Sequence, residues 1–278
     1  MSTEGAADLA PFLAHLRAHG VRFDVAAPLR RDPDAHGHPH ASRHGDGTVH
    51  VPGLPPIAER RRGRVGSDHA TWSVAVAIAA GPLVRPGDTV WEIGTGSGVL
   101  AVAAHHLGAR RIVATDVDAG ALEIAAGNLR AAGARAALHA GSLLDAIPAD
   151  EPPPAVVIAN LPHKPRREGD VLPLAEDGGP EGYTLLAAFA RQAGRRLPRG
   201  ARLVFFQHSL PHPRNLALLA EAFDLRLLSW KRRLLAPGEY GALQEWFVER
   251  SRAGTSYVAG REPEDRYLIA CVWLASRR

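Results

Sequence analysis

The chain has 278 residues, of which 46% are hydrophobic, and a formal net charge of +4. It is long enough to bury a core. No apolar run reaches the roughly eighteen residues that a membrane span needs, and the first residues show no secretory signal. The single cysteine, Cys271, excludes an internal disulfide and a cysteine-rich zinc site, and it is typical of a protein in the reducing cytoplasm.

The excess of basic residues is the one feature of the composition that suggests a nucleic-acid partner. Almost all of these residues are arginine, because Lys164 and Lys231 are the only lysines. The densest basic run, residues 60–64, has no aromatic residues between its arginines to stack on bases. We therefore predict a solvated basic surface rather than a nucleic-acid contact.

Residues 1–66 are predicted to form a small N-terminal extension or lid. An amphipathic helix covers residues 8–19, whereas residues 30–66 are rich in Pro, Gly, His and Arg and predict little regular structure. Histidines recur in this stretch without acidic residues at helical spacing, so we predict no metal site. They are His36, His38, His40, His44 and His50.

Residues 67–278 are predicted to form one doubly wound α/β domain. A helix over residues 72–80 follows Ser67 or Asp68, either of which can cap it. The predicted strands are residues 89–93, 111–115, 136–139, 155–159, 202–207, 225–235 and 267–274. The predicted helices between them are residues 99–107, 119–132, 183–196, 215–223 and 240–250. This order gives a seven-stranded, mostly parallel sheet with helices on both faces.

The junction between the first of these strands and its helix reads Trp-Glu-Ile-Gly-Thr-Gly-Ser-Gly-Val-Leu, residues 91–100. A turn without Cβ atoms lets backbone N–H groups approach a ligand closely. A dinucleotide-binding loop reads G-x-G-x-x-G, and its third glycine would stand where Val99 is. The spacing therefore argues against a dinucleotide.

Acidic residues accompany the glycine loop. Asp116 ends the second strand, about twenty residues after the first glycine, where an acid can accept both hydroxyls of a ribose. Val117 beside it can pack on an adenine face, and Glu92 would face the ligand from the first strand. This combination predicts a nucleoside-containing ligand at the carboxyl edge of the sheet.

The loop E-x-G-x-G-x-G with its following acid resembles motif I of the class I, Rossmann-like S-adenosylmethionine-dependent methyltransferases. The resemblance implies that the cofactor is S-adenosylmethionine. The residues expected to contact it are Glu92, Gly94, Thr95, Gly96, Gly98, Asp116, Val117 and Asn160. In this family the residue after the third strand also contacts adenine, a place that Ser142 and Leu143 occupy here.

The sequence Asn160-Leu161-Pro162-His163 follows the fourth strand and resembles the N-P-P-Y motif of amino-group methyltransferases. The Asn160 oxygen and the next backbone carbonyl can each accept an N–H and so orient an acceptor nitrogen, and Pro162 fixes the direction of that carbonyl. Leu161 replaces the first proline but leaves its carbonyl available. His163 keeps a planar ring that can pack on the acceptor, and it adds a group that titrates near neutrality.

Two further features lie near this motif. The acidic, glycine-rich residues 174–183 are similar to the segment that follows N-P-P-Y in the release factor glutamine methyltransferase. His69 and Thr71 lie where related enzymes close over their ligand, and His208 ends the fifth strand at the same edge. We expect these three residues to contact the substrate or to form a lid.

The resemblance implies methyl transfer from S-adenosylmethionine to a nitrogen. The altered motif and the irregular extension favour a small-molecule acceptor, such as an amino acid or a specialised metabolite, and hence a role in biosynthesis. A protein glutamine or a nucleic acid is the second hypothesis. The sequence also leaves open cyclisation of the cofactor's own aminobutyl chain, or a binding protein that retains the fold without turnover.

Overall fold

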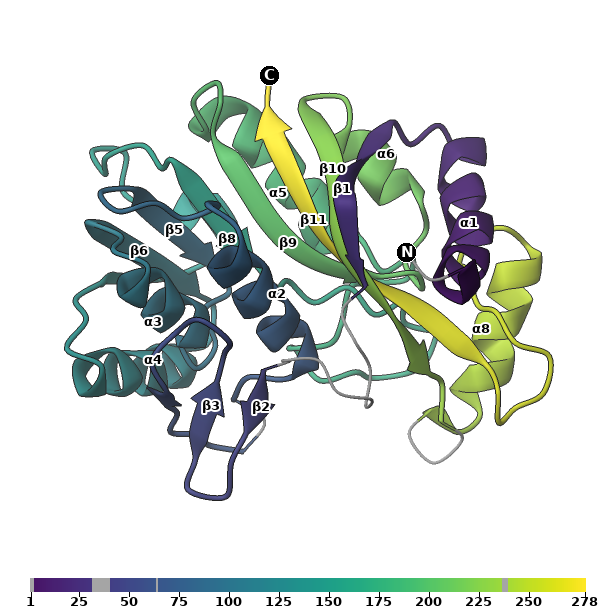
Figure 1. Cartoon of the computed structure of the whole chain (residues 1–278), viewed down its shortest axis with the longest axis horizontal. Coiled ribbons are helices and arrows are strands. Elements are labelled where there is room, and N and C mark those ends of the chain that lie inside the picture. The colour runs from purple at the N-terminus through teal and green to yellow at the C-terminus, as the bar shows by residue number, and fades with distance from the viewer. Residues whose placement is uncertain (1–2, 32–40, 64, 237–239) are drawn as a thin grey trace.

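The computed structural model describes residues 3–31, 41–63, 65–236 and 240–278. Within these ranges an eight-stranded sheet has the order β1-β10-β11-β9-β8-β5-β6-β7, with helices on both faces (Figure 1). Strand β11 is antiparallel to both of its neighbours, and the other neighbouring strands are parallel. The predicted α/β fold with a mostly parallel sheet is confirmed.

The predicted strands of the large sheet and the helices between them lie close to their predicted places, and β1 and η1 are additional. The strands are β1 (Phe23–Arg31), β5 (Thr89–Ile93), β6 (Arg111–Asp116), β7 (Ala137–Ala140), β8 (Val156–Ala159), β9 (Arg202–His208), β10 (Phe223–Leu234) and β11 (Tyr267–Arg277). The helices are α1 (Thr3–Ala18), α2 (His69–Ala80), α3 (Val99–His106), α4 (Ala119–Ala131), the 3-10 helix η1 (Leu143–Ala146), α5 (Thr184–Arg196), α6 (Arg214–Leu219) and α8 (Leu243–Arg252).

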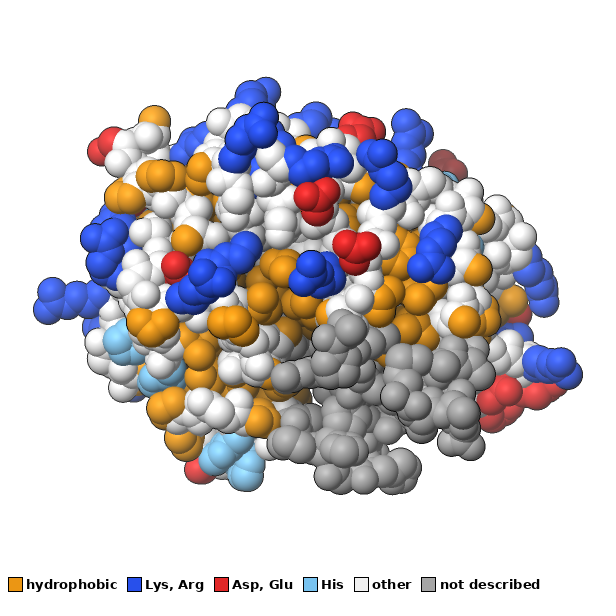
Figure 2. All heavy atoms as spheres, turned by 45° about the horizontal axis from the view of Figure 1, so that its top comes forward, with side chains coloured by type: hydrophobic (Ala, Val, Ile, Leu, Met, Phe, Trp, Pro, Cys, Tyr) orange, Lys and Arg blue, Asp and Glu red, His pale blue; other side chains and the backbone are white. Residues whose placement is uncertain are grey.

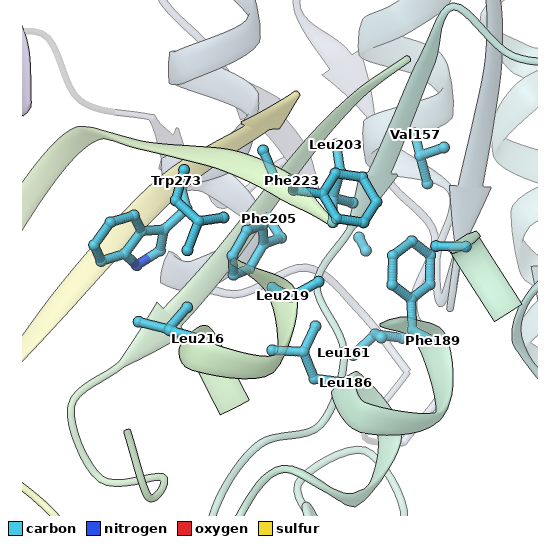
Figure 3. Packing of buried hydrophobic residues seen from close by; sticks show 14 of the residues in the cluster. Val157, Leu161, Leu186, Phe189, Leu203, Phe205, Leu216, Leu219, Phe223 and Trp273 are labelled. Carbon is cyan, nitrogen blue, oxygen red and sulfur yellow. The ribbon is translucent and has the colours of Figure 1, made fainter. Parts of the chain in front are cut away.

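The two faces of the sheet bury separate hydrophobic clusters because side chains alternate along each strand. In β5, Trp91 and Ile93 belong to one cluster, and Val90 belongs to the other. The first cluster receives side chains of α1, α5 and α6, including Phe189 and Leu219 (Figure 3). The second receives α2 and α3. Both faces are thus covered, as a doubly wound sheet requires.

The structure adds an eighth strand to the predicted seven. Strand β1 pairs in parallel with β10 at the edge of the sheet, and Phe12 and Leu16 of α1 are buried in the same cluster as the sheet residues. The sequence analysis did not assign β1 because the short alternation of Phe23, Asp24 and Val25 is followed by Ala26, Ala27 and Pro28, and a proline argues against a strand except at a sheet edge. The division of the chain at residue 66 stays a prediction about its domains.

The rest of the N-terminal segment contains a small antiparallel sheet of β2 (Ser42–Arg43), β3 (Thr48–His50) and β4 (Ile57–Ala58). The rings of His44 and His50 lie 4.1 Å apart on it, whereas His36, His38 and His40 fall outside the described residues. In the part of the chain that the structure describes, no group of His, Cys, Asp and Glu has the geometry of a metal site.

One predicted helix boundary extends into a strand. Helix α6 ends at Leu219, and Phe223 begins β10 instead of ending a helix over residues 215–223. Phe223 is 1% exposed and pairs with Arg277 of β11. Its burial in the sheet therefore overrides the weak helical pattern of the preceding residues.

The edge formed by the amino ends of the parallel strands is turned toward the viewer in Figure 2, where Lys and Arg side chains outnumber carboxylates. Arg202 and Asp88 form an ion pair of 2.8 Å at the starts of β9 and β5. No helix in the described ranges is long and apolar enough to cross a membrane. The residues predicted to carry chemistry lie at the opposite, carboxyl edge.

Candidate active site

The glycine loop connects β5 to α3 in a backbone conformation that glycine permits. Gly94, Gly96 and Gly98 all have positive φ angles, of 72°, 54° and 80°. A Cβ on Gly98 would lie 3.0 Å from the Cβ of Ala125, so this glycine lets α3 and α4 approach each other. A Cβ on Gly96 would meet nothing within 4 Å, and its peptide therefore borders open space where a ligand can approach.

Asp116, at the end of β6, holds this loop from the neighbouring strand. Its Oδ2 accepts the N–H of Gly96 at 2.9 Å, and its Oδ1 accepts the N–H of Asp118 at 3.0 Å. Each carboxylate oxygen keeps a further lone pair, which suits the two hydroxyls of a ribose. Val117 follows with 56% of its surface exposed, so an apolar side chain is accessible next to Asp116.

Glu92 lies beneath the glycine loop. It is 1% exposed, and its Oε2 accepts the hydroxyl of Thr95 at 2.6 Å. Burial raises the pKa of its carboxyl to about 8, and the nearby Asp116 acts in the same direction. Glu92 thus supports the loop from below, and a direct contact with a ligand stays a prediction.

Ser142 and Leu143 follow β7 at the same edge. Ser142 is exposed, whereas Leu143 is buried with φ at 54°, the one non-glycine residue with a positive φ in the described ranges. A leucine in this conformation is strained, and such strain is concentrated at functional sites. Ser142 thus lies at the surface at the carboxyl edge of the sheet, just after β7, and its contact with adenine stays a prediction.

Asn160 follows β8, and its amide is oriented by residues far away in the sequence. Its Nδ2 donates to the Thr71 hydroxyl at 3.0 Å, and that hydroxyl donates to Asp68 at 3.1 Å. Asp68 also caps helix α2 by accepting the N–H of Thr71. Among the described residues no hydrogen bond is donated to the Asn160 Oδ1, so this oxygen keeps its capacity to accept an N–H, and a contact with a substrate stays a prediction.

Leu161 is buried where the related motif has proline. Its side chain packs in the cluster that contains Leu186 (Figure 3), and one of its methyl groups would lie 3.4 Å from a Cβ on Gly94. Its carbonyl accepts from the Nδ1 of His163 at 2.6 Å. The carbonyl expected to be available thus has one of its two lone pairs engaged. Pro162 follows it, half-buried.

His163 is fixed through both ring nitrogens. The Nδ1 proton is donated to Leu161, and Nε2 accepts the backbone N–H of His208 at 3.3 Å. Burial lowers the pKa of His163 below its ordinary value, so the ring loses its proton at a lower pH than the exposed side chain considered in the sequence analysis. A Cβ on Gly178 would lie 2.6 Å from the His163 Cα, so the glycine-rich segment packs directly on the motif.

The structure brings His69 and His208 to His163. The His208 ring lies 4.2 Å from that of His163, and both His69 and His163 face Phe206. Burial lowers the pKa of His69 to about 4, helped by Arg233, which contacts its ring. Burial and then His163 lower the pKa of His208 well below its ordinary value. The three imidazoles are therefore neutral at pH 7.

The residues present fit S-adenosylmethionine. The loop has an open glycine backbone, Asp116 has lone pairs for the ribose, and Val117 presents an exposed apolar surface for adenine. Asn160 lies at the end of the strand next to β5, at the same edge. The sequence analysis did not predict that Phe206 and Arg233 contact His69, because only the tertiary fold brings them together.

Comparison with known proteins agrees with this geometry. The family model described as Ribosomal protein L11 methyltransferase (PrmA) matches residues 66–165, from the start of α2 past the Asn160 motif. A ribosomal protein L11 methyltransferase of Pelotomaculum thermopropionicum is 43% identical over 95 residues, which cover 34% of this chain and 30% of that protein. The protein of this name from Symbiobacterium thermophilum is 59% identical over 46 residues, 16% of this chain and 15% of its own length. The matches thus span less than a third of these curated relatives.

Among solved structures, a precorrin-6y C5,15-methyltransferase of Geobacter metallireducens shares the fold with a TM-score of 0.51 and 14% identity. That match covers 82% of this chain and all of the other. The chain therefore has the class I fold of S-adenosylmethionine-dependent methyltransferases. Its matched segment resembles the ribosomal protein L11 enzymes and not specifically the release factor glutamine methyltransferase.

These relatives correct one sequence-based prediction. A small molecule was expected to accept the methyl group, because the motif is altered and the extension is irregular. The matching relatives are named for a ribosomal protein, which overturns the preference for a small-molecule acceptor. The altered motif has a structural reason instead, since Leu161 packs in the core and His163 ties the motif to β9.

Proposed function

We propose that this protein transfers a methyl group from S-adenosylmethionine to a nitrogen atom of a protein. The observation that carries the proposal is the position of Asn160, with an oriented amide, at the same sheet edge as the glycine loop. The match over residues 66–165 supports the cofactor, and the names of the matched relatives support a protein acceptor.

The cofactor would supply a methyl group on a positively charged sulfur, which a nitrogen lone pair can displace directly. Gly96, Asp116 and Val117 would hold it, with Ser142 at the rim. Asn160 would accept an N–H of the substrate through Oδ1 and thereby aim the nitrogen lone pair. Orientation of this kind lowers the barrier without a covalent intermediate.

The proton state of the site limits which nitrogen can react. His69, His163 and His208 all have lowered pKa values. Both ring nitrogens of His163 are also engaged. His163 therefore does not act as a general base, and the acceptor nitrogen must already carry a free lone pair when it binds. A neutral amine meets this condition, because it needs no base before the transfer.

The acceptor is tested by incubating the purified chain with methyl-labelled S-adenosylmethionine and ribosomal protein L11 from the same organism. We expect label in the protein and a mass increase by whole methyl groups, mapped to nitrogen atoms by fragmentation. A pool of amino acids and metabolites is the matched comparison. Label confined to that pool, or to oxygen or carbon atoms of the protein, would refute the proposal.

A further inference from the structure

Glu59, which directly follows β4, is a buried carboxylate outside the residues considered so far. The residue is 5% exposed, and its side chain is fully buried. Glutamate is almost never buried without partners, because the removal of a charge from water is costly unless hydrogen bonds replace its hydration. The partners of Glu59 therefore indicate what the residue does.

These partners come from three separate parts of the chain. Arg43 of the small sheet donates to Oε2 at 2.9 Å. Ser67, just before α2, donates through its backbone N–H to Oε1 and through its hydroxyl to Oε2. Ser97 of the glycine loop donates its hydroxyl to Oε1 at 2.6 Å. Glu59 thus connects the small sheet, the start of α2 and the glycine loop.

A second buried side chain strengthens this connection. Asn128 of α4 is 0% exposed, and its amide nitrogen donates to the carbonyls of Arg60 and Ser97. Its oxygen accepts the backbone N–H of Arg60 at 2.7 Å. The backbone next to Glu59 and the backbone of Ser97 are therefore held by the same amide.

The glycine loop depends on such outside contacts. Three of its residues are glycines with positive φ, which restrain the backbone least. Within the described residues two of its side chains make hydrogen bonds, each to a buried glutamate. Thr95 bonds Glu92 of the preceding strand, and Ser97 bonds Glu59. The second contact crosses 38 residues of sequence.

We propose that Glu59 is a positioning residue of the cofactor site. By holding Ser97, it fixes the course of the loop backbone around Gly96 and Gly98 that borders the proposed cofactor site. The N-terminal segment then sets cofactor affinity through Glu59 without contacting the cofactor. This inference rests on the proposed cofactor site at the glycine loop.

The test compares the full-length parent chain with the variants Glu59→Gln, Ser97→Ala and their combination. Calorimetry with S-adenosylmethionine should show a roughly tenfold higher Kd for each single variant, the size expected for loss of a hydrogen bond to a charged group. The double variant should lose no more than the worse single variant, because both substitutions remove one contact. Glu123→Gln, at an exposed glutamate of α4, is the matched control and should bind like the parent.

Hydrogen exchange separates positioning from general stability. We expect faster exchange of the amides of residues 96–99 in both single variants, with unchanged exchange in the β9–β11 core. Ser97→Ala keeps the test valid if Glu59→Gln does not fold. Unchanged Kd and unchanged exchange at residues 96–99, with only a lower melting temperature, would overturn the inference. If the parent itself does not bind the cofactor, the proposed function fails, and the exchange data still decide whether Glu59 holds the loop.

Discussion

The proposed cofactor half and the proposed acceptor half of the site are held by different kinds of side chains. In the cofactor half, Glu92, Asp116 and Glu59 each accept a hydrogen bond from the glycine loop. In the acceptor half, Asn160 is held by the neutral hydroxyl of Thr71, and three uncharged imidazoles lie together. Carboxyl groups therefore hold the loop, whereas the Asn160 amide and the three imidazoles are uncharged and have charged side chains such as Asp68 and Arg233 behind them.

The difference follows from what each half must do. A glycine loop has little intrinsic stability, so hydrogen bonds to the carboxyl groups around it restrain its backbone. The bond from Thr95 to Glu92 is a neutral one at pH 7, because the pKa of Glu92 is raised to about 8. The acceptor half must leave a nitrogen lone pair free and must accept N–H protons without attracting an extra proton. The comparison predicts that substitutions in the cofactor half change cofactor affinity, whereas substitutions in the acceptor half change turnover.

The largest effect is expected at Asn160. Asn160→Ala removes the oxygen that would aim the acceptor nitrogen, and the methyl-transfer rate at saturating cofactor should fall about 100-fold. Calorimetry on the same variant should give a cofactor Kd within about threefold of the parent, because the glycine loop is untouched. Retention of the parent rate would remove Asn160 from the acceptor half.

The next effect is expected at Asp116. Asp116→Ala should raise the Kd for S-adenosylmethionine about 30-fold, because the ribose contacts and the Gly96 contact are lost together. Asp118→Ala, two residues later, is the matched control. Asp118 caps α4, so its loss should lower the melting temperature and leave the affinity nearly unchanged. Equal losses of affinity in both variants would contradict a specific role for Asp116.

Glu92 should make stability fall as the pH rises. Its pKa of about 8 in the folded chain exceeds the ordinary value of 4.5, so the folded state keeps a proton that the unfolded state releases. This contribution is complete below pH 4.5 and is lost as the pH rises through 8. The free energy of unfolding should therefore fall by about 2 kcal/mol between pH 6 and pH 7.5.

Denaturant unfolding at several pH values measures this effect. Glu92→Gln should lose that part of the pH dependence, whereas Glu123→Gln should keep it. The histidines act in the opposite direction, because their lowered pKa values cost stability as the pH falls below 6.5, but they are common to all three proteins. Parallel pH curves for the parent and Glu92→Gln would show that Glu92 is ionised in the folded chain.

The smallest effect is expected at Thr71. Thr71→Val removes the hydroxyl that orients the Asn160 amide, and turnover should fall about tenfold, the cost of one lost hydrogen bond. Thr71→Ser keeps the hydroxyl and should remain within about threefold of the parent. If serine and valine are equally impaired, the methyl group rather than the hydroxyl matters, and the relay from Asp68 to Asn160 is wrong.

The two halves also differ in how far the sequence could predict them. The glycine loop and Asp116 lie within 26 residues and keep the spacing of a strand, a turn and a helix. Their contact can therefore be predicted from the local sequence. Thr71 and Asn160 are 89 residues apart, and their hydrogen bond depends on how α2 packs on the sheet. The sequence did not indicate that Glu59 is buried, because a single acidic residue before a run of arginines is typical of a solvated surface.

Burial accounts for the remaining differences. Strand β1 went unnoticed because only its pairing with β10 marks it as part of the sheet. The pKa of His163 is lower than the sequence suggests because the fold buries the ring, and both of its nitrogens are engaged in hydrogen bonds. Neither the pairing at a sheet edge nor the enclosure of a ring can be read from the local residue pattern.

The central claim is that the glycine loop and Asp116 bind S-adenosylmethionine independently of Asn160. Calorimetry of S-adenosylmethionine with the parent, Asp116→Ala and Asn160→Ala tests it most directly. We predict binding of similar affinity by the parent and Asn160→Ala, and much weaker binding by Asp116→Ala. No binding by the parent, or undiminished binding by Asp116→Ala, would contradict the account.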